Sequence, residues 1–131
     1  MSQRDLTIHV CTACRRIRED LAEGYDQPGL NLTEALSQRL AASKGITVVA
    51  VECLAVCKRP CTVAFAADGK WTYLVGDLDA DLHLDDIVGA AEAYAASANG
   101  IIPWKERPLP FRKGVVARVP PLAGRQQGSP T

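Results

Sequence analysis

The sequence has no excess of either charge, few aromatic residues and no long apolar run. Its 15 basic and 15 acidic residues balance, whereas a protein that binds nucleic acid or an anionic membrane usually carries a basic excess. No stretch approaches the roughly 18 apolar residues of a membrane-spanning helix. The polar residues 1–5 are not followed by the apolar core of a signal peptide. We therefore expect a soluble cytoplasmic protein that contacts neither nucleic acid nor a membrane.

Cysteine, by contrast, occurs five times in 131 residues. In a reducing cytoplasm, cysteines more often bind metal or carry out redox chemistry than form structural disulfides. The odd number also argues against complete pairing in disulfides. The cysteines are therefore the first candidates for a functional site.

The first half of the chain has the pattern of a β-α-β unit. Residues 6–10 alternate between apolar and polar side chains and predict a strand that ends at Cys11. Asn31 is a suitable helix N-cap, with Glu34 at the reciprocal position of a capping box. The apolar face of this helix is Leu32, Ala35, Leu36 and Leu40. The β-branched run 46–51 predicts a second strand, buried on both faces.

The rest of the chain predicts a hairpin, a second helix and an arm. Residues 62–66 and 71–75 have strand character and are separated by Asp68-Gly69, a pair that favours a tight hairpin turn. A helix is expected over 81–98. After Gly100 the chain becomes rich in proline and basic residues without a sustained period.

This order of elements, β-α-β and then β-β-α, is that of an α/β, thioredoxin-like domain. We expect a mixed four-stranded sheet with helices over residues 1–100, with the first two strands parallel. Residues 15–29 are expected to be mainly a connection, with one helical turn at most. Residues 101–131 are expected to form an extended C-terminal arm with a disordered end.

The two cysteine groups follow the two strands of the expected parallel pair. They are Cys11 and Cys14 after the first strand, and Cys53, Cys57 and Cys61 after the second. Neighbouring parallel strands have their carboxyl ends at the same edge of a sheet, so the two groups should meet in space. Four thiolates suit either a [2Fe–2S] cluster or a tetrahedral zinc ion. Lys58 and Arg59 would offset their negative charge.

Two other interpretations of the cysteines stay open. The pair Cys11 and Cys14 has the spacing of a thiol–disulfide redox motif after a strand, although no well-formed helix starts at Cys14 and three cysteines are left without a role. A buried cysteine can also be a small core residue. The regular spacing of four of the five argues against that role for all of them.

Residues 52–64 and 68–75 resemble the thioredoxin-like [2Fe–2S] ferredoxins. Those proteins have a Cys-x3-Cys loop followed by proline, a short strand, an Asp-Gly turn and a strand with Trp or Tyr. The resemblance implies that Cys11 is the first ligand and that Cys53 and Cys57 are the second pair. It also implies a homodimer.

The chain departs from these ferredoxins at two positions. Their first two ligands are separated by a longer loop than the two residues between Cys11 and Cys14, and they have no counterpart of Cys61. Cys14 and Cys61 are therefore alternatives for the fourth ligand, and zinc stays an alternative to the cluster.

A second resemblance covers residues 7–122. The chain is similar to a bacterial family of uncharacterised "predicted metal-binding proteins", and the similarity rests on residues 10–15, 57–62 and 103–108. Members of that family resemble accessory proteins of cobalamin and metal metabolism. This resemblance implies a role in metal handling.

Other candidate residues have ordinary structural explanations. His9 is expected to face solvent or a helix, and His83 to lie on the surface near the start of a helix. The acidic residues 77–86 are typical partners of a helix dipole. The basic, aromatic residues 104–118 would suit single-stranded nucleic acid, but packing on the domain or on a partner is favoured.

The sequence thus predicts a small ferredoxin-like protein for electron transfer or cluster carriage, and it favours a non-enzymatic carrier or metal-binding protein over an enzyme. The expected metal ligands are Cys11, Cys14, Cys53 and Cys57, with Cys61 in reserve. The expected cofactor is a [2Fe–2S] cluster, or else zinc. The expected partner is a protein of a redox or metal pathway.

Overall fold

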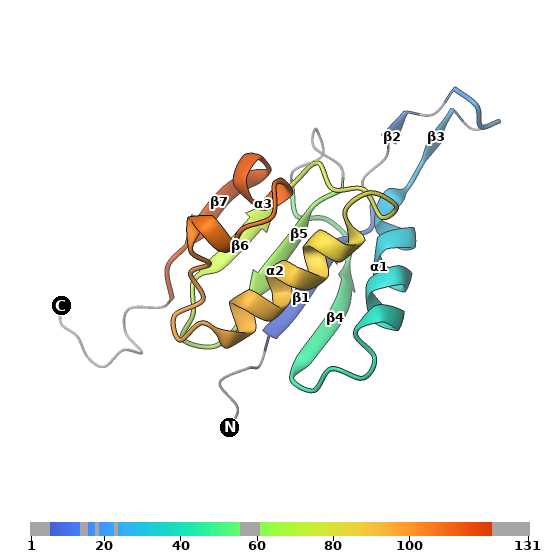
Figure 1. Ribbon diagram of the computed structural model, residues 1–131. Helices are drawn as coiled ribbons and strands as arrows, with labels where there is room; N and C mark the ends of the chain where they lie inside the picture. The colour runs from blue at the N-terminus through green and yellow to red at the C-terminus, as the bar shows by residue number, and fades with distance from the viewer. Residues whose placement is uncertain (1–5, 14–15, 18, 23, 56–60, 122–131) are drawn as a thin grey trace.

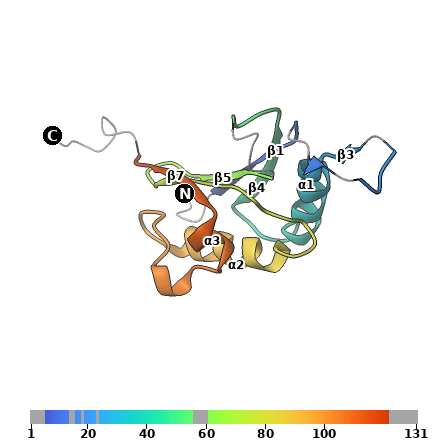
Figure 2. The ribbon, with the colours of Figure 1, turned by 90° about the horizontal axis from the view of Figure 1, so that it is seen from above.

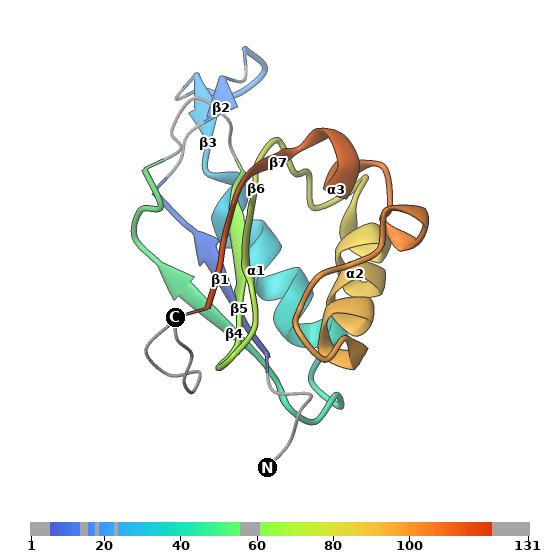
Figure 3. The same ribbon diagram turned by 90° about the vertical axis from the view of Figure 1, so that its left-hand side faces the viewer.

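A computed structural model describes residues 6–13, 16–17, 19–22, 24–55 and 61–121. A five-stranded sheet with the order β4-β1-β5-β6-β7 is its centre, and the helices lie on one face of it (Figures 1, 2 and 3). In the described part of the chain, no helix is long and apolar enough to cross a bilayer.

The predicted β-α-β unit is confirmed. β1 (Leu6–Cys11) pairs in parallel with β4 (Ile46–Val51), so that Cys11 lies beside Val51 at the carboxyl ends of both strands. The connecting helix is α1 (Pro28–Arg39). Leu32, Leu36 and Leu40 are buried, as the apolar period predicts.

Three local predictions in this half are wrong. α1 begins three residues before Asn31, because Pro28 occupies the first turn, where a missing N–H costs nothing. Part of the expected connection forms a small hairpin of β2 (Arg16–Ile17) and β3 (Tyr25–Asp26). β4 is an edge strand and is only partly buried, so the prediction that this apolar run is buried on both faces is wrong.

The predicted hairpin and second helix are present. β5 (Val63–Ala66) pairs antiparallel with β1 and with β6 (Thr72–Val75). In the turn between them only Gly69 has a positive φ, at 75°, so the turn is not the two-residue type that Asp68-Gly69 favours. α2 (Leu84–Ala96) is shorter than the predicted 81–98.

Residues after 100 add to the sheet, so the prediction of four strands and an extended arm is wrong. They form η1 (Trp104–Glu106), the short helix α3 (Pro110–Lys113) and β7 (Val115–Val119), which pairs antiparallel with β6. Ile102 and Phe111 are fully buried in the core. The burial of these two side chains thus holds residues 101–114 against the domain, although their sequence has neither the helix nor the strand period. Residues 122–131, whose disorder was predicted, lie outside the described residues.

Candidate metal centre

Cys11 is the last residue of β1 and is fully buried. Its backbone N–H donates to Thr62 O at 3.0 Å, and its sulfur lies 3.8 Å from Glu52 O, just beyond β4. The side chain is therefore directed toward the end of the neighbouring parallel strand. This is the edge at which the topology predicts that the cysteines meet.

Cys61 lies at the same edge, two residues before β5 begins at Val63, and is also fully buried. Its backbone exchanges two hydrogen bonds with Leu78, of 3.2 and 3.0 Å. Its sulfur is 3.7 Å from Cys11 O. Cys61 is thus beside Cys11, although 50 residues separate them in the sequence.

Cys53 follows β4 and is exposed. Its sulfur accepts a hydrogen bond from the Ala55 N–H at 3.2 Å. Ala55 has a φ of 64°, in the left-handed region that residues with a Cβ seldom adopt. An amide directed at a cysteine sulfur is the kind of contact that tunes an iron–sulfur centre.

We call the edge that contains Cys11, Cys53 and Cys61 the cysteine end of the sheet. Backbone hydrogen bonds hold it together: Thr12 N–H donates to Val51 O and Ala13 N–H to Glu52 O, both at 2.9 Å. The beginning of α1 also packs against it. A Cβ on Gly29 would lie 1.9 Å from Cys11 O, so only glycine allows this approach.

Cys14 and Cys57, with Lys58 and Arg59, lie outside the described residues. Within the described ranges, no three His, Cys, Asp or Glu side chains lie close enough together to hold a metal ion. The predicted ligand set therefore stays a prediction. The structure describes the approach of Cys61 to Cys11 and the position of Cys53 beyond β4.

The two histidines have different settings. His9 is half-buried on β1, between Val49 of β4 and Ala64 of β5. His83 is also partly buried, and its Nδ1 accepts a hydrogen bond from the Asp79 N–H at 3.0 Å. This bond leaves the hydrogen of a neutral imidazole on Nε2.

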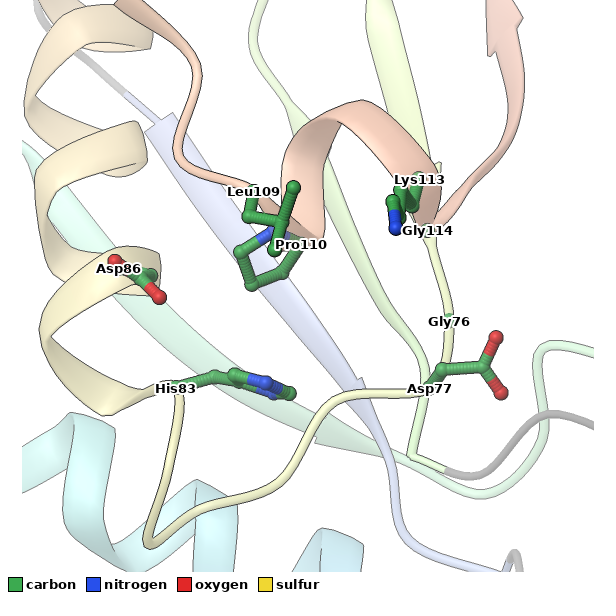
Figure 4. A pocket seen from close by; sticks show the side chains of 8 residues that line it. All are labelled: Gly76, Asp77, His83, Asp86, Leu109, Pro110, Lys113 and Gly114. Atoms are coloured by element: carbon green, nitrogen blue, oxygen red, sulfur yellow. The ribbon is translucent and has the colours of Figure 1, made fainter.

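His83 lines an open pocket of about 260 Å³ that the sequence did not predict (Figure 4). The other lining residues are Gly76, Asp77, Asp86, Leu109, Pro110, Lys113 and Gly114. The pocket adjoins the cysteine end, because Asp77 precedes Leu78, the backbone partner of Cys61. It lies between α2 and α3. Because these helices are separate in the sequence, no local sequence pattern predicts the pocket.

Residues 8–121 match the family DUF1636, described as a protein of unknown function. The chain belongs to this family. The description of DUF1636 names no metal, so the predicted label of metal-binding protein is not confirmed for this family. Among curated proteins, no sequence matches the DUF1636 chain.

Among solved structures, the DUF1636 chain is similar to a thioredoxin-like [2Fe–2S] ferredoxin from Aquifex aeolicus. The TM-score is 0.56 at 15% sequence identity, and the match covers 87% of this chain and 92% of the ferredoxin. At this identity the likeness shows the fold alone. The predicted thioredoxin-like fold is confirmed.

Proposed function

We propose that this DUF1636 chain binds a [2Fe–2S] cluster and serves in electron transfer or cluster carriage. One observation carries the proposal: Cys11 lies at the same end of the sheet as Cys53 and Cys61, which follow it by 42 and 50 residues. Thiolates are the ligands that iron–sulfur clusters use.

The residues at the cysteine end fit such a cofactor. Cys11 would be one ligand, in a buried environment that keeps water away. Cys53 would be a second, already accepting an amide hydrogen bond. Cys14 and Cys57 would complete the set, with Cys61 as the alternative to Cys14. The cluster would supply one-electron redox chemistry, and the neighbouring amides would stabilise its negative charge.

The likeness to a protein described as a [2Fe–2S] ferredoxin supports the cluster over zinc. The test is to purify the full chain without oxygen and to measure iron, acid-labile sulfide and zinc together with the visible spectrum. We expect a red-brown protein with equal amounts of iron and sulfide. A colourless protein with one zinc per chain would refute the cluster and support a zinc-binding module.

The fourth ligand is decided by two matched substitutions, Cys14→Ser and Cys61→Ser. If Cys14 is the ligand, Cys14→Ser lowers the iron content and shifts the visible and electron paramagnetic resonance spectra, whereas Cys61→Ser leaves both unchanged. The reverse result assigns Cys61. Circular dichroism of both variants identifies a loss of folding, which is a concern for Cys61 because its side chain is buried.

One observation favours a second function, thiol–disulfide exchange by Cys11 and Cys14. The N-terminus of α1 lies against the backbone of Cys11 and Thr12, and Gln27 Nε2 donates to Thr12 O at 3.1 Å. Helix N-termini stabilise thiolates. The full burial of Cys11 argues against its attacking a disulfide of another protein. A colourless, metal-free protein whose Cys11–Cys14 dithiol becomes a disulfide while it reduces the disulfide of a substrate would support this function.

A further inference from the structure

The segment from η1 to α3 exposes large apolar side chains. Trp104 is 59% exposed and Leu109 is 60% exposed, whereas Phe65, Tyr73, Tyr94 and Phe111 are fully buried. We call the surface formed by Trp104, Lys105, Arg107, Leu109, Arg112 and Lys113 the η1–α3 surface. Exposed tryptophan and arginine together are the composition of protein-binding hot spots.

Trp104 is held in place and does not simply protrude. The guanidinium groups of Arg107 and Arg112 lie over its ring, 5.4 and 5.5 Å from the centroid. Arg107 is fixed in turn, because its Nε donates to Ile102 O at 2.8 Å. A preorganised aromatic side chain loses little conformational entropy when a partner covers it.

The η1–α3 surface is basic in a chain that is neutral overall. Residues 105–113 contain four of the 15 basic residues but only one of the 15 acidic residues. An acidic partner would be attracted to this surface and would be oriented by it. Two acidic residues, Asp77 and Asp86, line the pocket together with Lys113, so we expect an acidic partner to avoid that side of the surface.

The surface borders the cysteine end. Leu109, Pro110 and Lys113 form one wall of the pocket, and Gly76 N–H donates to Gly114 O at 2.8 Å (Figure 4). Leu78, two residues after Gly76, is bonded to Cys61. A protein seated on η1 and α3 would therefore be close to the cysteines.

We propose that the η1–α3 surface docks an acidic redox protein that exchanges one electron with the centre at the cysteine end. The electron leaves the reduced group of one protein and enters the oxidised group of the other, and no bond breaks. This inference rests on the proposed function. Nucleic acid fits less well, because successive bases stack on several exposed aromatic rings, whereas Trp104 is the one aromatic side chain of this surface.

The test measures binding of labelled flavodoxin, a small acidic one-electron carrier, to the full chain by fluorescence anisotropy. Cytochrome c, a basic carrier, and a short single-stranded DNA are the comparison probes. We expect flavodoxin to bind best, and more weakly at high ionic strength. Lys113→Glu should weaken binding about tenfold at low ionic strength. Lys44→Glu makes the same charge change at an exposed position on the α1–β4 connection and should have little effect.

Trp104→Ala should weaken binding at both ionic strengths, since it removes apolar contact. Equal effects of Lys113→Glu and Lys44→Glu, tighter binding of DNA, or no binding of flavodoxin would each overturn the docking surface. Binding does not depend on electron flow. A zinc-loaded chain that binds flavodoxin through Lys113 would refute the cluster alone, and a cluster-containing chain without such binding would refute the surface alone.

Discussion

The two ends of the β-sheet use their polar groups for different purposes. At the end opposite the cysteines, side chains tie separate segments together. The buried ammonium of Lys70, in the β5–β6 turn, donates to Tyr94 O and Ala95 O at 3.3 and 3.1 Å. Tyr94 OH donates to Trp71 O. The two bonds from Lys70 satisfy carbonyls near the end of α2. The polar groups of Lys70 and Tyr94 therefore have a structural role in the fold.

At the cysteine end, backbone groups hold the structure, and packing does not explain the exposed sulfur of Cys53. Thr12 and Ala13 extend the pairing of β1 with β4 through their own amides. The sulfur of Cys53 is exposed beyond the last strand residue. The comparison supports the proposal that one end of the sheet serves stability and that the other holds the cofactor.

The strongest test of this division is Gly29→Ala. The new Cβ would lie 1.9 Å from Cys11 O, a backbone atom that cannot move without moving β1. We expect a loss of about 3 kcal/mol in the free energy of unfolding, at the upper end for overpacking. Urea denaturation measures this loss, and the visible spectrum shows whether the proposed cluster is lost with it.

Gly89→Ala is the matched control, because Gly89 also lies in a helix, α2, but has open space around its Cα. Alanine has the higher helix propensity, so this change should stabilise the chain by about 0.5–1 kcal/mol. If both substitutions have the same sign, α1 does not approach Cys11 as described.

The sequence predicts the strands and the approach of Cys61 to Cys11, because both depend on local pattern and strand direction. The alternation in residues 6–10 and the run 46–51 suffice to place Cys11 beside the end of β4. The start of α1 was predicted wrongly because the cap preference of Asn31 is a local signal. The observed start depends on Pro28 and on the contact between Gly29 and Cys11, which is a tertiary one.

The position of β7 and the pocket could not be predicted. β7 pairs with β6 because the residues before it are anchored in the core. Ile102 and Phe111 are fully buried there, and Arg107 Nη2 donates to Tyr73 Oη at 3.2 Å. Residues 101–121 have no apolar periodicity from which these tertiary contacts could be predicted. The site has the same limit: strand order brings the cysteines to one edge, but which sulfurs coordinate depends on loops that have no repeating pattern.

A second test concerns the opposite end. Lys70→Met keeps the length of the side chain but removes two charge-assisted hydrogen bonds to α2 carbonyls. We expect the free energy of unfolding to fall by about 2 kcal/mol, with an unchanged visible spectrum and iron content. Lys44→Met, at an exposed position, should change stability by less than about 0.5 kcal/mol. Loss of the centre without loss of stability would contradict the division between the two ends.

The smallest expected effect is the alkaline response of Tyr94. Burial of this side chain, with a further contribution from Tyr73, raises the pKa of its phenol above the ordinary value. The folded state therefore keeps the proton that the unfolded chain releases near pH 10. Tyr94→Phe should lower the free energy of unfolding by about 1 kcal/mol at neutral pH, through the lost bond to Trp71 O.

The sign of the pH effect follows from that raised pKa. The stability that the phenol contributes is fully present below about pH 10 and is lost as the pH rises toward the folded-state pKa, by about 1.4 kcal/mol per unit. The unaltered chain should therefore lose its advantage over Tyr94→Phe above about pH 10. Urea denaturation of both chains on either side of that pH measures the difference. A constant difference would mean that Tyr94 ionises as readily in the folded chain as in the unfolded one, and that the opposite end is more open to water than its hydrogen bonds indicate.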